Sequence, residues 1–510
     1  SGACAGGTVR DSRRDKLSSA SRPAAKLSAI SIFVTMTPID KSIDPVPEVA
    51  GSDTHRTAGA ELPASRQGGS RFRGKSVVTK FLPWVTKGGL AVVDYGLISG
   101  SNFLLGILLA RWLSPREYGA YALSFSFFIL AGFLYQTLLL EPLSVFSGTL
   151  FRENLRGYLK TTLWIHWALS LVMCLILAIA AGVTSQIGHS HLLAVALAGM
   201  TIATPFILMH GLGRRSFYLT MSPGPAAFAS VFYCGLVVGG VYLVFRLGWL
   251  SSFTAFLIMG LGALVSSVIM VFQLNRTLAP ATGRPRLRAT CGKHWEYGRW
   301  ALATCVVGWI PNYVYLPLVS SFSGMAAAGE LRALMNLAAP VLQTYAALSM
   351  LFLPYAARIQ SEKGRSDASS LNRRLAVLFV AGSVAYWAVL IPLKQPLFHF
   401  LYGGKYMESA YLIPLFALET TIWSASLGPA ILLRAMESPR SLFIANGAAS
   451  AVAVLVGIPA TKFFGLPGVI WSMIGANFLY VVVAFILFER KLSTLNGAPV
   501  AGVVESLYAD

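Results

Sequence analysis

Hydrophobic and polar positions follow one another in long blocks along this chain, and the clearest pair of blocks begins just after Asp94. Leu97–Ala110 and Ala120–Leu140 contain no charged residue, and a short polar link with Pro115 and Gly119 separates them. At about 1.5 Å of rise per residue, a helix over the second block is long enough to cross a hydrocarbon core of about 30 Å. Proline and glycine in the link favour a turn. The pattern predicts a transmembrane helical hairpin.

The same block pattern continues along the chain and predicts an all-α integral membrane protein with about 12 transmembrane helices. The stretch from Thr161 to Gly213 has no Asp, Glu, Lys or Arg and is long enough for two spans, with a turn near Gly188. The predicted spans cover residues 89–110, 120–141, 160–185, 191–213, 226–246, 251–275, 299–319, 330–353, 374–396, 409–433, 441–461 and 466–488.

Short sequence pieces of the first half recur in the same order in the second half. The matched pairs are Tyr95-Gly96 with Tyr297-Gly298, Ser114–Gly119 with Ser323–Gly329, Glu141-Pro142 with Leu353-Pro354, and Ser222-Pro223 with Ser438-Pro439. Each piece is short enough to match by chance, but the offset grows steadily along the chain. Many transporters contain internal repeats of this size. We therefore predict two similar six-helix lobes.

The two predicted lobes divide the chain into five segments. Residues 1–80 form a basic N-terminal tail, rich in Ser, Gly and Pro and predicted to be disordered. An N-terminal lobe over 81–275, a basic cytoplasmic linker over 276–295, a C-terminal lobe over 296–490 and a tail over 491–510 follow. The chain does not begin with Met, and Met36 is a plausible start, which would place residues 1–35 before the native one.

Composition and charge support a membrane protein and argue against nucleic acid as a partner. Hydrophobic residues make up 55% and charged residues 12%, with a mean hydropathy of +0.63, whereas soluble domains have about 25% charged residues. The net charge of +20 comes from Lys and Arg in the tail and in the loops after even-numbered spans. By the positive-inside rule, both termini are cytoplasmic. We expect a multi-pass membrane protein.

The sequence gives little support for a catalytic, cofactor or metal site. HExxH, GxSxG, CxxC and DxD patterns do not occur, and the five cysteines are scattered. His189 and His191 could contribute to a metal site, but two histidines in a short turn are more often ordinary loop residues. We expect no enzyme activity, no cofactor and no bound metal.

Candidate site residues are the ionisable and amide groups at membrane depth, because such groups are costly there. Glu419 lies mid-span between two prolines, and its alternative role is a structural pair with an arginine. Arg332 and Asn336, with Gln343, form a polar stripe on one face of span 8. Arg299 and Arg332 could bind phosphate or acidic sugar groups. The other candidates are Asp94, Asn102, Gln136, Glu141, His210 and Asn312, with His166 in span 3. Any of these could instead join helices to one another, but together they predict a hydrated cavity.

Four stretches of the chain resemble a known family. YGLISGSNFLLGILLARWLSPREYGAYAL, RRSFYLTMSPGPAA, GELRALMNLAAPVLQ and LYGGKYMESAYLIPLFAL are similar to the polysaccharide and O-antigen type flippases of the multidrug/oligosaccharidyl-lipid/polysaccharide (MOP) exporter superfamily. The resemblance covers about residues 80–490. It implies two six-helix lobes related by a pseudo-twofold axis, with a central cavity that opens alternately to each side.

The resemblance also implies a location and a function: translocation of an undecaprenyl-pyrophosphate-linked oligosaccharide across the bacterial plasma (inner) membrane for exopolysaccharide or O-antigen biosynthesis. The expected partners are membrane lipids, the lipid-linked oligosaccharide, and a polysaccharide polymerase and glycosyltransferases of the same pathway. One alternative is a MATE-type drug/cation antiporter of the same superfamily, which would use acidic residues deep in the N-terminal lobe, whereas Asp94 and Glu141 lie near span ends. The other is a polymerase or ligase, which the short predicted external loops disfavour.

Overall fold

A computed structural model describes residues 76–186, 190–281, 283–363 and 365–494, and the described residues are helical with short connections. In the first half the helices are α1 (Ser76–Trp112), α2 (Pro115–Tyr135), η1 (Gln136–Leu140), α3 (Glu141–Gly148), η2 (Arg152–Asn154), α4 (Leu155–Gln186), α5 (His191–Leu219), α6 (Pro223–Arg246) and α7 (Ser252–Thr277). In the second half they are α8 (Leu287–Tyr313), α9 (Tyr315–Lys363), α10 (Arg365–Leu390), α11 (Lys394–Tyr402), η3 (Met407–Leu412), α12 (Ile413–Ala425), α13 (Leu427–Ala435), α14 (Pro439–Leu455) and α15 (Gly457–Thr494).

The predicted hairpin forms because its link stops one helix and starts the next. Ser114 lies in an extended conformation, and its hydroxyl accepts a hydrogen bond from the Glu117 backbone N–H at 3.2 Å. Pro115 occupies the first turn of α2, where the N–H that proline lacks would have no helical partner. The Glu117 carboxylate accepts a hydrogen bond from the Ser252 N–H at 3.1 Å at the start of α7. The link thus joins three helix ends.

Ten helices of the described part are long and apolar enough to span a membrane. All twelve predicted spans fall on helices of the structure, because two of the long helices contain a break. The stretch Ala301–Gln360 contains two predicted spans, and Gly324 separates them with a φ of 91°. Gly465, with a φ of 60°, separates the first residues of α15 from its long second part. The eleventh predicted span corresponds to the shorter helix α14, which continues into the start of α15.

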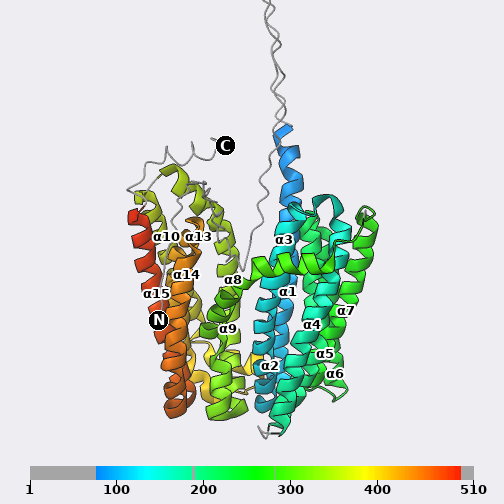
Figure 1. The fold of residues 1–510 in the computed structure, drawn as a ribbon. Coiled ribbons are helices and arrows are strands. Elements are labelled where there is room, and N and C mark those ends of the chain that lie inside the picture. Colours follow the sequence, from blue (N-terminus) through cyan, green and yellow to red (C-terminus); the bar gives the residue numbers. More distant parts are fainter. Residues whose placement is uncertain (1–75, 187–189, 282, 364, 495–510) are drawn as a thin grey trace, which may run out of the picture.

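Two groups of helices stand side by side in Figure 1, with α1–α7 on one side and α9, α10 and α13–α15 on the other. The start of α1 and the end of α15 lie at the same end of the molecule (Figure 1). Large apolar side chains on the outside of α4 are exposed, among them Trp164 and Leu171. This is the surface expected where a helix faces lipid.

The predicted boundaries of the tail and the linker differ from the observed helix ends. Residues 1–75 lie outside the described part of the chain, and α1 already begins at Ser76, inside the predicted tail. Helix α8 begins at Leu287, so the second half of the predicted linker 276–295 is helical. Figure 1 shows the first part of α8 running across the direction of the other helices, from one group toward the other.

The two groups meet closely at the end of the molecule that carries the α1–α2 turn. Lys405 donates hydrogen bonds to the carbonyl oxygens of Arg111 at 2.7 Å and Leu113 at 2.8 Å. The Tyr406 hydroxyl donates to the Ala110 carbonyl at 3.3 Å, and Arg111 donates to the Phe400 carbonyl. We call this contact, between residues 110–119 and residues 325–329 and 400–406, the turn junction.

Candidate functional site

Asp94 lies on α1 and is fully buried, with both carboxylate oxygens occupied. Arg214 of α5 forms an ion pair with it at 2.7 Å and donates two further hydrogen bonds through Nε. The hydroxyls of Tyr218 and Ser230 each donate to this carboxylate at 2.5 Å. Asp94 therefore joins α1, α5 and α6 within the first group of helices. A carboxylate with this many donors has little capacity left for a further ligand.

Arg332 and Asn336 of α9 face α2, so both lie where the two groups of helices meet. The Asn336 amide donates to the Tyr118 hydroxyl at 2.8 Å, and Asn336 is buried. The Arg332 guanidinium carbon lies 5.7 Å from the centre of the Phe125 ring, within the range of a cation–π contact. The Arg332 Nε is buried without a hydrogen-bond partner. A buried guanidinium N–H without a partner is costly and available to an acceptor.

The third residue of the predicted stripe also contacts the first group of helices. The side-chain oxygen of Gln343 accepts hydrogen bonds from the Tyr95 hydroxyl at 2.9 Å and from the Ser99 hydroxyl at 3.3 Å, both on α1. Arg332, Asn336 and Gln343 thus share one face of α9, and that face lies against α1 and α2.

Glu419 lies on α12 and is 8% exposed. The Asn477 amide of α15 donates to one carboxylate oxygen at 2.6 Å, and the Thr420 hydroxyl donates to the other at 3.0 Å. No lysine, arginine or histidine lies within ion-pair distance of Glu419 in the described part of the chain. In the described part of the chain the partners of this carboxylate are therefore an amide and a hydroxyl, and no arginine pairs with it there.

The other predicted residues are dispersed. The His210 ring shares a hydrogen bond with the Ser266 hydroxyl at 2.9 Å and stacks on Tyr233, inside the first group. His166 shares one with the Tyr135 hydroxyl at 2.8 Å. Gln136 begins the π-helix η1 and Glu141 begins α3, and both side chains are partly exposed. Asn102, Arg299 and Asn312 are exposed, and the Asn312 amide donates within its own helix to the Gly308 carbonyl at 2.9 Å.

The predicted residues thus form three separate sites around Asp94, Arg332 and Glu419. Sequence reasoning missed the residues that complete these sites, chiefly Tyr118 and Asn477. Tyr118 lies in SPREYGAYAL, part of the first stretch that resembles the family, but a tyrosine next to a turn does not by itself indicate a functional residue. Asn477 is a single amide in a long apolar helix, the same type of residue as the candidates on other spans.

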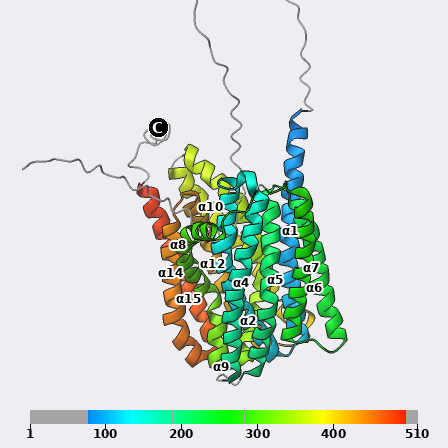
Figure 2. The same ribbon diagram turned by 45° about the vertical axis from the view of Figure 1, so that its right-hand side comes forward.

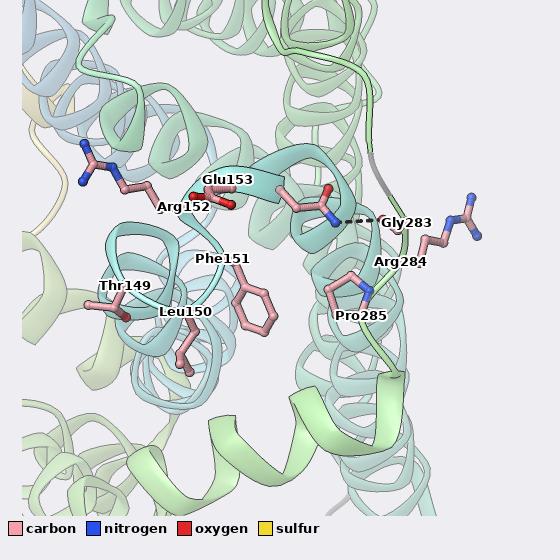
Figure 3. A pocket seen from close by; sticks show the side chains of 9 residues that line it. Thr149, Leu150, Phe151, Arg152, Glu153, Gly283, Arg284 and Pro285 are labelled. Atoms are coloured by element: carbon pink, nitrogen blue, oxygen red, sulfur yellow. Dashed lines mark hydrogen bonds between the residues drawn. The ribbon is translucent and has the colours of Figure 1, made fainter.

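A pocket of about 570 Å³ opens elsewhere, between the α3–α4 connection and the linker before α8. Figure 3 shows Phe151 between Leu150 and Pro285, while Arg152 and Arg284 extend away from one another. Asn154 donates to the Gly283 carbonyl at 3.1 Å and ties the linker to the start of α4. No predicted site residue lines this pocket. The pocket therefore lies where the linker contacts the start of α4, apart from the predicted site.

No group of three or more His, Cys, Asp or Glu side chains that could hold a metal ion occurs among the residues that the structure describes. Of the two loop histidines, His191 is exposed, and His189 lies outside the described residues.

Comparison with known proteins identifies the family. Residues 108–411 match the profile of a family described as polysaccharide biosynthesis protein. The chain belongs to this family. No curated protein matches the chain.

Solved structures with the same arrangement of helices show the fold of this polysaccharide biosynthesis protein. An inward-facing multidrug resistance MATE family transporter of the MOP superfamily matches with a TM-score of 0.66 and 12% identity, over 80% of this chain and 99% of that one. The lipid II flippase MurJ in an inward closed conformation matches with 0.61 and 15%, over 79% and 88%. A MOP superfamily transporter from Pyrococcus furiosus matches with 0.56 and 14%, over 81% and 96%.

Family and fold together confirm the resemblance found in the sequence. The chain belongs to a polysaccharide biosynthesis protein family and has the all-helical fold seen in MOP superfamily transporters, and ten helices of its described part are long and apolar enough to cross a membrane.

Proposed function

We propose that this protein moves a lipid-linked oligosaccharide, with an undecaprenyl-pyrophosphate carrier, across the bacterial plasma membrane by alternating access. Its product would serve exopolysaccharide or O-antigen biosynthesis. Glycosyltransferases would supply the lipid-linked substrate and a polymerase would consume it. In this proposal the tails and the linker are cytoplasmic, which places the turn junction at the periplasmic end.

Arg332 carries this proposal. It lies between the two groups of helices, beside the Phe125 ring, and its Nε lacks a partner. Asn336, which donates to the Tyr118 hydroxyl, is one helical turn further along α9. A guanidinium with an unused N–H donor suits phosphate or acidic sugar groups, and the aromatic ring and the amide beside it suit a sugar. The reacting groups of an enzyme are not needed for such a task, because transport requires binding and a change of access only.

The turn junction supports alternating access. Lys405 and Tyr406 bind the end of α1 through backbone carbonyl oxygens, so the contact can break and re-form without leaving a buried charge unpaired. Under the proposed orientation this end is closed to the periplasm, and the cargo would leave only after these contacts separate.

The alternative, a drug/cation antiporter, has one observation in its favour. Glu419 accepts hydrogen bonds from an amide and a hydroxyl, so this carboxylate could take up a proton or a cation. Asp94 argues against the same role in the first group, because Arg214, Tyr218 and Ser230 already saturate it.

A deletion strain complemented with variants tests the proposal. Lipid-linked intermediates are extracted and sized, and surface or secreted polysaccharide is measured. We expect deletion, and complementation with R332Q, to abolish polysaccharide and to accumulate one defined lipid-linked oligosaccharide. R246Q is the matched control, because Arg246 is exposed at the end of α6 and donates a hydrogen bond to Tyr242 of the same helix. A normal amount of surface or secreted polysaccharide in a clean deletion strain would contradict the proposal. Reduced tolerance to toxic cations as the only phenotype would favour the antiporter.

A further inference from the structure

The first part of α8, residues 287–299, is placed as a surface helix and not as part of a span. It contains the second half of the predicted linker and continues directly into the apolar stretch that begins at Ala301. Figure 1 shows it lying across the direction of the spanning helices, and Figure 2 shows it nearly end-on at the outside of the bundle. We call this segment the surface helix.

One face of the surface helix is fixed against the first group of helices. His294 shares a hydrogen bond with the Tyr158 hydroxyl at 2.7 Å, and its Nδ1–H donates to the Leu138 carbonyl of η1 at 3.2 Å. A Cβ added to Gly298 would lie 3.0 Å from the Thr137 carbonyl oxygen, and Thr290 is buried one turn before His294. Because these positions follow the spacing of helical turns, they determine which residues face outward.

The outward face combines apolar and cationic side chains. Leu287 is 48% exposed and Trp295 is 55% exposed, and Cys291 lies between them at helical spacing and is also exposed. Arg288 and Lys293 are exposed on the same segment, and Arg284 and Arg286 precede it. The acid Glu296 is exposed and already lies 3.4 Å from Lys293.

We propose that the surface helix is a binding site for anionic phospholipid headgroups of the leaflet into which α8 enters. A helix with Trp and Leu on one flank and Lys and Arg beside them lies in the headgroup region, with its apolar flank in the acyl boundary. Cationic residues near a membrane gain affinity from anionic lipids. Continuity with the apolar stretch at Ala301 places the segment at a membrane surface. The inference does not depend on which cargo the transporter carries.

This lipid site would act at the connection between the two groups of helices. The surface helix is bound to α4 and η1 through His294, and its continuation packs on α2, where the Trp309 indole donates to the Ser126 carbonyl at 3.1 Å. Anionic lipid bound here would stabilise the docked surface helix.

The test uses the full-length protein with a dye on Cys291, after Cys4, Cys174 and Cys234 are replaced by serine and the buried Cys305 is left in place. An environment-sensitive fluorophore reports the position of the surface helix in nanodiscs of phosphatidylcholine, with and without phosphatidylglycerol. We expect a blue-shifted emission and quenching by brominated acyl chains, both stronger with phosphatidylglycerol and weaker at high salt.

Affinity is measured by titrating the detergent-solubilised protein with phosphatidylglycerol. Each cation neutralised in R286Q/R288Q/K293Q should weaken binding by about fivefold. The control is R373Q/R374Q, compared with the triple variant per cation neutralised, because Arg373 and Arg374 are exposed on α10. W295S keeps all charges and should lose the quenching by acyl chains while most of the salt dependence stays.

Three results would overturn the proposal: equal emission with and without phosphatidylglycerol, quenching by aqueous iodide in place of brominated lipid, or an equal loss of affinity in the control. A melting temperature in phosphatidylcholine that matches the unsubstituted protein shows that the triple variant is folded, so that its loss of phosphatidylglycerol binding reports the site.

Discussion

Gly119 of α2 and Gly329 of α9 pack reciprocally at the turn junction. A Cβ added to Gly119 would lie 1.7 Å from the Met325 carbonyl oxygen, and a Cβ added to Gly329 would lie 2.5 Å from the Pro115 carbonyl oxygen. Each glycine therefore contacts the carbonyl four residues before the other. Reciprocal contact of this kind is what a twofold relation between two repeats produces, and these two glycines end the repeated segments Ser114–Gly119 and Ser323–Gly329.

Gly119→Ala should open the turn junction. A methyl group this close to a backbone oxygen cannot be relieved by a side-chain rotation, so the closed arrangement should lose roughly 3 kcal/mol or more. Spin labels at Arg116 and Phe322, both exposed near the junction, should report a longer distance. Gly132→Ala on the same helix is the control, because no atom lies within 4 Å of its added Cβ. Unchanged distances in Gly119→Ala would show that the junction can absorb the methyl group.

Asp94→Asn should destabilise the first group of helices. The change leaves Arg214, which is 19% exposed, without its counter-charge, and we expect a loss of roughly 3 kcal/mol, the lower end for broken buried pairs. Thermal unfolding in detergent measures it. D94N/R214Q should be less destabilised than the sum of the single changes, because it removes both charges. Near-normal stability of Asp94→Asn, together with lost transport, would instead make Asp94 an ion-binding residue.

Docking of the surface helix should weaken in acid. Burial lowers the pKa of His294, so the undocked helix takes up a proton at a higher pH than the docked one. Docking is therefore fully stable above the ordinary histidine pKa of about 6.5 and loses stability as pH falls from there toward the lowered pKa. Tyr158 and the Leu138 carbonyl are its partners, and both are uncharged in this range.

Hydrogen–deuterium exchange of residues 287–299, corrected for intrinsic rates, measures this effect. Protection should fall between pH 7 and pH 5, about the range in which histidine titrates. H294Q should give protection that does not change with pH, since it has no titrating group there. Equal pH dependence in both proteins would assign the effect to another residue.

Glu419→Gln should abolish polysaccharide export while the protein remains folded in the membrane. The amide can still accept from Asn477, so the stability should change by only about 1 kcal/mol, the difference between a charged and a neutral acceptor. Loss of export then reports the lost charge and proton affinity. Thr420→Ser keeps the hydroxyl that bonds Glu419 and should export normally. Normal export with Glu419→Gln would make this carboxylate structural.

The spans and the repeat could be predicted from the sequence because they depend on local properties. Apolar blocks such as Ala120–Leu140 must form helices in a membrane, since no other partner for their backbone groups exists there. The break at Gly324 lies within the predicted turn Ser323–Gly329. The predicted polar stripe of Arg332, Asn336 and Gln343 also follows from helical spacing alone.

The partners of these residues were decided only by the tertiary structure. Nothing in the sequence distinguishes Arg214 from the other basic residues at span ends, and 120 residues separate it from Asp94. Asn477 and Glu419 lie on helices far apart in the chain. Helical periodicity fixes which residues share a face, but it contains no information on which face meets which. That choice depends on the packing of whole helices, and here it placed Gly119 against Gly329.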